Sequence, residues 1–160
     1  MKYILSLGAN TGSREQSLDK AVNKLHQFGR IEKRSGIYKT EPVGIKNQAD
    51  FLNIICLFET GLGPFRLLRK LKSIETASGR VRTQRWGSRV IDIDIIDWDG
   101  GRICTPILEI PHQQMELRKF VLLPLREILP DYKNRSQLTI KQLIENCPDR
   151  SEIRAYKDQW

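Results

Sequence analysis

The sequence predicts an α+β fold of the ferredoxin-like class. Apolar runs that are typical of strands alternate with two longer segments in which apolar residues recur at helical spacing. In chain order these segments give strand, helix, strand, strand, helix and strand, which is the split βαβ arrangement of ferredoxin-like folds. The chain contains no internal repeat and no linker-like stretch, so we expect one domain over residues 1–160 with a C-terminal extension.

The first part of the chain is expected to place a helix between two strands. Residues 3–7 form a short apolar run that predicts the first strand. Ser13 and Gln16 have the spacing of a capping box, and the helical period that follows them ends at Gly29. Residues 31–39 are then expected to form a moderately polar strand.

The middle of the chain contains the most regular patterns. Residues 40–50 have no hydrophobic period and are expected to be a loop, whereas the alternation in residues 51–60 predicts a strand with one apolar face. A second helix is expected to begin at Pro64 and to end at Gly79, because helices tolerate proline in the first turn and often end before glycine. Residues 91–97 predict the fourth strand.

The C-terminal part is less regular. Residues 106–130 are expected to be irregular, with short helical pieces. Residues 139–147 predict a small helix, because Thr139 and Gln142 form a second capping-box pattern.

Composition and charge limit the classes of protein to which the chain can belong. No stretch approaches the roughly 20 apolar residues of a membrane span, and the first residues lack a signal-peptide layout, so we expect a cytoplasmic protein with no membrane partner. Cys56, Cys104 and Cys147 are too far apart for a metal or disulfide framework and are expected to be reduced. The net charge of +8 indicates an anionic partner, either nucleic acid or a small polyphosphate. The arginines between Gly79 and Val90 are grouped compactly beside the paired aspartates, which favours a nucleotide with its metal, so no nucleic-acid partner is expected.

Two aspartates are the strongest indication of chemistry. In a strand over residues 91–97, Asp92 and Asp94 project from one face and the neighbouring isoleucines from the other. Paired carboxylates repel each other unless a cation lies between them, and Mg²⁺ commonly binds through one or two carboxylates together with substrate phosphates. The same alternation is also typical of a half-exposed sheet. Asp97 and Asp99 have the opposite parity and are expected near the strand end or in the turn with Gly100 and Gly101, as turn residues and not as ligands.

A basic loop precedes these aspartates. It has no acidic residue, and its four arginines are Arg80, Arg82, Arg85 and Arg89. Guanidinium groups match phosphate oxygens in bidentate geometry, so beside the aspartates the loop indicates phosphate binding, although an ordinary solvated loop has the same composition. Trp86 is expected either to cover a ligand ring or to attach the loop to the body of the domain.

Two further residues each allow two interpretations. Glu75 lies on the apolar stripe of the second helix, near the end where a carboxylate is unfavourable without a compensating cation or donor. It is either an exposed boundary residue with a salt bridge or a site carboxylate. His112 is either a surface or packing residue or a ligand-binding one, and no Ser/His/Asp or Cys/His arrangement can be argued from spacing.

With these residues in place, the chain resembles the 6-hydroxymethyl-7,8-dihydropterin pyrophosphokinases of folate biosynthesis over nearly its whole length. The segment that runs from Arg-Trp-Gly to the aspartates is specific to that family. The matching segments are Leu7-Gly8-Ala9-Asn10, Tyr38 to Gly44, Asp50-Phe51-Leu52-Asn53, Ile74-Glu75 with Gly79 to Arg82, Arg85 to Arg89 with Asp92 to Ile95, Pro111-His112, and Met115, Arg118, Phe120 to Leu122 and Pro124-Leu125.

The resemblance implies transfer of pyrophosphate from ATP to the hydroxymethyl group of the pterin, with release of AMP, by a monomer with a three-layer αβα fold and a mainly antiparallel sheet. It implies two Mg²⁺ ions bound by Asp92 and Asp94, and a transfer step assisted by Arg80 and Arg89. The residues implied to contact ATP are Lys72, Glu75, Arg82, Arg85, Trp86, Ile95, His112 and Arg118. Those implied to contact the pterin are Thr40, Val43, Phe51, Asn53 and Phe120, with the two phenyl rings on either side of the pterin and the amide at its polar edge.

A basic ferredoxin-like RNA-binding module is the alternative from another class of protein. Such modules carry aromatic residues on a sheet face, and Phe51 and Tyr38 fit that description. Asp92 and Asp94 argue against it, because without metal they repel phosphates. A catalytically silent homologue that binds a partner is a third alternative.

Overall fold

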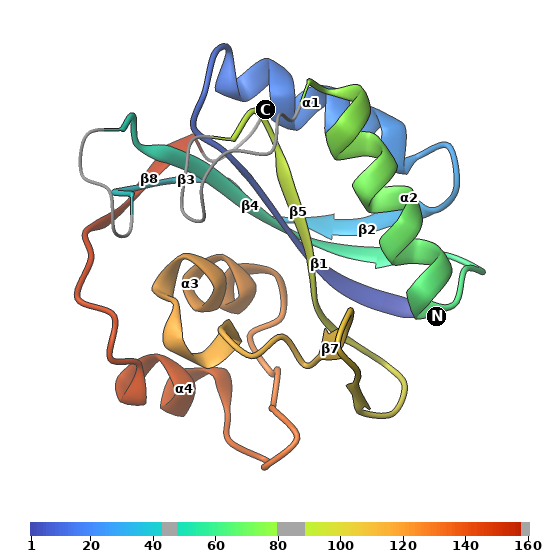
Figure 1. Cartoon of the computed structure of the whole chain (residues 1–160). Coiled ribbons are helices and arrows are strands. Elements are labelled where there is room, and N and C mark those ends of the chain that lie inside the picture. Colours follow the sequence, from blue (N-terminus) through green and yellow to red (C-terminus); the bar gives the residue numbers. More distant parts are fainter. Residues whose placement is uncertain (43–47, 80–88, 158–160) are drawn as a thin grey trace.

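The fold is an antiparallel sheet with helices on both faces (Figure 1). The computed structural model describes residues 1–42, 48–79 and 89–157. Its strands are β1 (Lys2–Ala9), β2 (Arg30–Arg34), β3 (Ile37–Thr40), β4 (Phe51–Glu59), β5 (Asp92–Trp98), β6 (Ile103–Cys104), β7 (Glu109–Ile110) and β8 (Ile153–Lys157). Its helices are α1 (Arg14–Leu25), α2 (Pro64–Ala77), the 3₁₀ helix η1 (Met115–Leu117), α3 (Lys119–Ile128) and α4 (Ile140–Asn146).

The sheet has β1 and β4 at its centre. Within the described ranges it has six strands in the order β5–β1–β4–β3–β8, and β2 pairs with the second half of β4. Each of these pairings is antiparallel. Helices α1 and α2 cover one face and α3 and α4 lie on the other, which gives three layers (Figure 1). The predicted α+β, three-layer αβα architecture of the ferredoxin-like class is thus confirmed.

Two apolar clusters hold the three layers together. Leu5 and Ile54 belong to the cluster under α1 and α2. Their neighbours Ile4 and Ile55, together with Ile96, belong to the cluster under α3 and α4. Successive residues of a strand point to opposite faces, so the two central strands bury apolar side chains on both sides.

One predicted strand is divided into two. Residues 31–39 form β2 and β3, which both pair with β4 and are separated at Ser35. The Ser35 backbone N–H donates to the Ile55 carbonyl (2.9 Å), and the Ser35 hydroxyl accepts from the Ile55 N–H (3.0 Å). The serine side chain therefore replaces a backbone acceptor at this point, and the regular ladder is interrupted.

The C-terminal part is more regular than its sequence predicts. The expected helical pieces are present as η1 and α3, but α3 is continuous over ten residues although Pro124 lies inside it, so that part is less irregular than expected. Val121, Leu122 and Leu125 are buried against the sheet, and this packing outweighs the hydrogen bond that the proline removes. Strand β8, which pairs with β3, was not predicted from any pattern in the sequence.

The two predicted capping boxes have different outcomes. Thr139 begins α4, its hydroxyl accepts from the Gln142 N–H, and the Gln142 side chain accepts from the Thr139 N–H, so this box is confirmed. Ser13 precedes α1 but makes no side-chain capping bond, so that box is wrong.

Two expectations from composition can be compared with the structure. The three cysteines are free, as expected, with Cys56 and Cys147 buried and Cys104 exposed. Among the described helices, none has both the length and the apolar composition that crossing a bilayer requires.

Candidate functional site

A cavity of about 550 Å³, lined by charged, polar and apolar side chains, opens on the face of the sheet that carries α3. Its floor comes from β1, β4 and β5, and its walls come from the end of β3 and from the segment that leads through η1 into α3. The lining residues are Ser6, Gly8, Thr40, Glu41, Phe51, Asn53, Arg89, Asp92, Asp94, Ile96, His112, Gln113, Gln114, Arg118, Phe120 and Val121. This one cavity brings together most of the predicted site residues that the structure describes.

Asp92 and Asp94 lie side by side in the floor, as their spacing predicts. Both line the cavity, whereas Ile91, Ile93 and Ile95 are buried in the cluster on the opposite face of the sheet. Burial and the nearby charge of Asp92 raise the pKa of Asp94, while the charges of Lys72 and His112 act in the opposite direction. The pair is therefore a site where additional positive charge is favoured.

Arg89 lies three residues before the start of β5, next to this pair. Its guanidinium forms an ion pair with the Asp92 carboxylate. Its backbone N–H donates to the Asn10 side-chain oxygen (2.7 Å), and the Asn10 N–H donates to the Arg89 carbonyl (3.0 Å). These bonds fix the backbone from which Arg89 extends over the carboxylates.

The predicted pterin residues meet at the other end of the cavity. Phe51 and Asn53 come from β4, Thr40 from the end of β3, and Phe120 from the first turn of α3. The Asn53 amide is buried and donates to the Thr40 hydroxyl (2.8 Å). A ring from the sheet, a ring from a helix and one fixed amide thus line the same space, which suits a flat ligand with a polar edge.

His112 and Arg118 contribute from the segment before α3. The His112 backbone N–H donates to the Ile96 carbonyl (2.8 Å), and His112 Nδ1 accepts from the Gln114 N–H (3.1 Å). In the neutral imidazole the proton is then on Nε2, so the ring can donate a hydrogen bond through that atom.

Three residues predicted to contact ATP, namely Lys72, Glu75 and Ile95, do not line the cavity. The Ile95 side chain is buried on the opposite face of the sheet, so only its backbone remains as a contact for ATP. Glu75 is 1% exposed and accepts from the Ile93 N–H (2.8 Å) and from Lys72 Nζ (2.9 Å). The expectation of an exposed Glu75 is wrong, but its predicted salt bridge is present. This carboxylate supports β5 between the two aspartates.

Five predicted site residues lie outside the described ranges. They are Val43, Arg80, Arg82, Arg85 and Trp86. Their roles stay predictions.

Sequence reasoning missed two floor residues. Gly8 and Ser6 line the cavity from β1, where Gly8 pairs with both Asn53 and Asp92 and Ser6 pairs with Asp94. The family motif contains Gly8, but the residue pattern alone gives Gly8 no role. The available signal is a glycine in a predicted strand, which often marks a place where a ligand or another backbone approaches closely.

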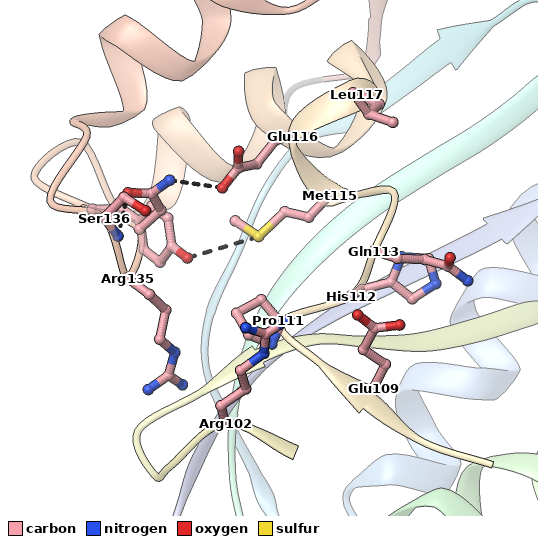
Figure 2. A pocket seen from close by; sticks show the side chains of 12 residues that line it. Arg102, Glu109, Pro111, His112, Gln113, Met115, Glu116, Leu117, Arg135 and Ser136 are labelled. Atoms are coloured by element: carbon pink, nitrogen blue, oxygen red, sulfur yellow. Dashed lines mark hydrogen bonds between the residues drawn. The ribbon is translucent and has the colours of Figure 1, made fainter. Parts of the chain in front are cut away.

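A second cavity of about 310 Å³ adjoins the first and shares His112 and Gln113 with it (Figure 2). It lies between the segment from Glu109 to Leu117 and the turn at residues 132–136. Asn134 donates to Glu116 there (2.7 Å). The sequence analysis did not predict this cavity.

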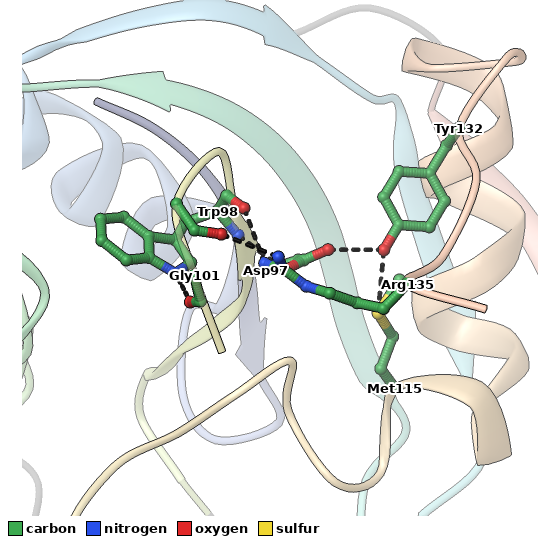
Figure 3. Close-up of polar contacts among 7 residues, drawn as sticks. Asp97, Trp98, Gly101, Met115, Tyr132 and Arg135 are labelled. Atoms are coloured by element: carbon green, nitrogen blue, oxygen red, sulfur yellow. Dashed lines mark hydrogen bonds and ion pairs between the residues drawn. The ribbon is translucent and has the colours of Figure 1, made fainter. Parts of the chain in front are cut away.

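Asp97 lies near the end of β5, one of the two places expected for it, but on the face opposite to the one that its parity predicts. It lies in β5 and is buried, and its carboxylate accepts from the Tyr132 hydroxyl (2.7 Å) and from Arg135 (3.0 Å) (Figure 3). The pairing register between β1 and β5 shifts between Ile4 and Leu5, and the extra residue reverses the parity of the later positions in β5. Asp97 thus fastens the end of β5 to the C-terminal part of the chain.

Comparisons with known proteins identify the family of the chain. The family model described as 7,8-dihydro-6-hydroxymethylpterin-pyrophosphokinase (HPPK) matches residues 4–130. A 2-amino-4-hydroxy-6-hydroxymethyldihydropteridine pyrophosphokinase of Bacillus subtilis is 45% identical over 97% of this chain and 90% of that protein. The protein of the same name from Aquifex aeolicus is 42% identical over 79% of each chain.

Solved structures show the same fold. The crystal structure of Plasmodium falciparum HPPK-DHPS with pteroate matches with a TM-score of 0.70 and 17% identity, over 90% of this chain. The present chain spans 42% of that longer chain. These matches give no support to an RNA-binding module. With the family model matching residues 4–130 and relatives alike over most of their lengths, the chain belongs to the 7,8-dihydro-6-hydroxymethylpterin-pyrophosphokinase family.

Proposed function

We propose that this protein transfers pyrophosphate from ATP to the hydroxymethyl group of 6-hydroxymethyl-7,8-dihydropterin and releases AMP, with two Mg²⁺ ions at Asp92 and Asp94. One observation carries the proposal: a single cavity contains paired carboxylates at one end and the Phe51–Asn53–Phe120 group at the other. The family supports the reaction. The Mg²⁺ requirement, a monomeric state, the cytoplasmic location and a single domain over residues 1–160 stay predictions.

The carboxylate pair fits Mg²⁺ by its chemistry. Hard oxygen donors suit this ion. Burial and the charge of Asp92 raise the pKa of Asp94, so a bound cation would favour the ionised carboxylate. Within the described residues no group of three or more histidine, cysteine or acidic side chains could hold a metal. In the proposed site, phosphate oxygens and water would complete the coordination. When bound, Mg²⁺ would neutralise charge on the triphosphate.

The remaining residues would position the two substrates. We place ATP along the outer edge of β5, which pairs with no further strand among the described residues. At that edge the Ile93 N–H donates to the Glu75 carboxylate. Ile95 lies two residues further along the strand, so its backbone groups point to the same edge and would contact the nucleotide. Lys72, His112 and Arg118 would contact the nucleotide or its phosphates, His112 through Nε2.

In the transfer step, the pterin hydroxymethyl oxygen forms a bond to the β-phosphorus, and the bond from this phosphorus to the oxygen that bridges it to the α-phosphate breaks. AMP leaves with the bridging oxygen, and the hydroxyl proton passes to solvent. Arg89, held beside Asp92, would stabilise the charge that develops on the transferred group. Such a reaction depends on positioning and charge neutralisation more than on a covalent intermediate.

The decisive experiment measures AMP released from ATP, with and without 6-hydroxymethyl-7,8-dihydropterin, across a Mg²⁺ titration. We expect release only with the pterin and only with the metal, and loss of release in Asp94→Ala with an unchanged circular dichroism spectrum. Pterin-independent hydrolysis, or near-normal turnover in Asp94→Ala, would refute the proposal. Titration with an oligoribonucleotide, beside a non-hydrolysable ATP analogue with Mg²⁺, tests the RNA-binding alternative directly.

A further inference from the structure

Gly8 lies at the centre of the cavity floor. In the pairing of β1 with its two neighbours, Gly8 is opposite Asn53 on β4 and opposite Asp92 on β5. It therefore separates the amide of the pterin end from the first carboxylate of the metal end. Any side chain at this position would stand between the two halves of the site.

The backbone does not require glycine at this position. The described glycines with positive φ are Gly12 and Gly79, and Gly8 has ordinary strand geometry. Glycine also weakens a strand interior relative to alanine, because it gains backbone freedom when the chain unfolds and has no side chain to pack. Space, rather than conformation, is the remaining structural reason for a glycine here.

The space is occupied by the Asn53 amide. A Cβ built on Gly8 would lie 2.7 Å from Asn53 Oδ1 and 3.7 Å from Phe51 Cδ1. By contrast, a Cβ on Gly61 or Gly101 would have no atom within 4 Å. The first distance is too short for a real contact, so an alanine would displace the amide.

The amide has little room to yield. Asn53 is 4% exposed, and on the side of β3 its Nδ2 donates to the buried Thr40 hydroxyl (2.8 Å). A shift away from residue 8 would press the amide against that hydroxyl, which is already at hydrogen-bond distance, or turn the amide out of the bond. The bare backbone of Gly8 on one side and the Thr40 hydroxyl on the other thus fix the position of the amide.

We propose that Gly8 and Thr40 are positioning residues of the pterin subsite, which hold the Asn53 amide where it reads the polar edge of the heterocycle. This inference rests on the proposed function. It predicts that Gly8 acts on pterin binding through Asn53, although Gly8 itself offers no polar side chain to the ligand. Because the nearest atoms to its missing side chain belong to Asn53 and Phe51, binding of the nucleotide should be far less affected.

The first test compares Gly8→Ala with the matched control Gly61→Ala, using calorimetric titration with 6-hydroxymethylpterin in the presence of a non-hydrolysable ATP analogue and Mg²⁺. We expect about a tenfold or greater loss of pterin affinity in Gly8→Ala, the scale of one displaced hydrogen-bonding group. Affinity for the ATP analogue alone should change less than about twofold, and Gly61→Ala should match the wild type. Equal pterin affinity in Gly8→Ala and wild type would overturn the inference.

A double-mutant cycle separates positioning from general damage to the fold. In an Asn53→Ala background, Gly8→Ala should cost less than about twofold in pterin affinity, because the group it displaces is absent. Full additivity of the two losses would overturn the inference. If Gly8→Ala does not fold, Thr40→Val and Thr40→Ser test the other side of the amide, and Thr40→Val should lose clearly more affinity than Thr40→Ser. Equal losses would contradict it.

The proposed function and this inference fail in different ways. A wild-type protein that does not bind the pterin contradicts the proposed function. A wild-type protein that binds the pterin, beside a Gly8→Ala variant that binds it equally well, contradicts only the role of Gly8.

Discussion

Asp94 is the residue at which stability and the proposed function conflict most directly. Burial and the charge of Asp92 raise its pKa above 3.8, the ordinary value for an aspartate. At pH values between the pKa of Asp94 in the unfolded protein and its higher pKa in the folded protein, the native state therefore binds more protons than the unfolded state. Without metal, the free energy of unfolding should fall as the pH rises through this window and stay lower above it.

We predict that Asp94→Asn makes the metal-free protein more stable at pH 7 and removes this part of the pH dependence, while turnover falls about 10³-fold or more because charge neutralisation is lost. Urea denaturation in EDTA at several pH values between 4 and 8 measures the first effect, and AMP release measures the second. Addition of Mg²⁺ should stabilise the wild type and not the variant. A variant less stable than the wild type at pH 7 would contradict this account.

The aspartates also show how far residue-level patterns can be trusted. The spacing of Asp92 and Asp94 predicts their shared face because β5 is regular there. The same reasoning fails for Asp97, because a register shift between Ile4 and Leu5 reverses the parity beyond it. A bulge is set by the pairing of two distant segments, and no local spacing in the sequence records it.

At the scale of elements, local sequence patterns predict a helix or strand correctly where one face of the element is apolar and its ends carry turn residues. Helix α2 and strand β4 match their predicted extents closely for this reason. Long-range packing decided the rest: α3 continues through Pro124 because its apolar residues are buried, and β8 exists because β3 offers a free edge. The site residues that depend on sheet register, Gly8 and Ser6, were missed for the same reason.

Helix α3 begins at a carboxylate from another segment. Asp149 accepts from the Lys119 N–H (3.0 Å) at the first residue of the helix and from the Ser151 N–H (2.9 Å). Although burial alone would raise the pKa of Asp149, the N–H donors and the charge of Arg118 lower it below 3.8. Arg118 and Phe120 line the cavity from this end of α3, so the contact orders part of the site.

We predict that Asp149→Ala lowers the free energy of unfolding by about 1 kcal/mol, the scale of a lost helix cap. A lowered pKa means that the stabilisation is present above about pH 4 and fades as the pH falls through the folded pKa. The difference between wild type and variant, measured by urea denaturation, should thus be constant from pH 5 to 8 and shrink below pH 4. Asp131→Ala, at an exposed aspartate, is the matched control, and an equal loss there would contradict the capping role.

At the scale of the whole molecule, the cavity depends on contacts from every layer. Glu75 reaches β5 from the α2 side, and the cavity opens on the α3 side. The residues after the matched 4–130 segment act from the periphery: Tyr132 holds Asp97, Asp149 holds α3, and β8 extends the sheet beside β3. The described part of the C-terminal extension, up to residue 157, therefore supports the site without lining its main cavity.

The net charge of +8 gives a prediction at this same scale. ATP is a polyanion and the pterin is neutral, so only ATP should be attracted by the overall field of the protein. Since the screening length shortens from about 10 Å at 0.1 M salt to about 3 Å at 1 M, added salt should weaken this attraction. We expect the KM for ATP to rise several-fold between about 50 and 500 mM KCl, while the KM for the pterin changes less than about twofold.

Pterin-dependent AMP release with Mg²⁺ in excess measures both constants, and tetramethylammonium chloride in place of KCl separates screening from a specific effect of K⁺. If both constants rose equally, the salt would be acting on the fold or on the shared cavity, and long-range attraction of the nucleotide would be excluded as the cause.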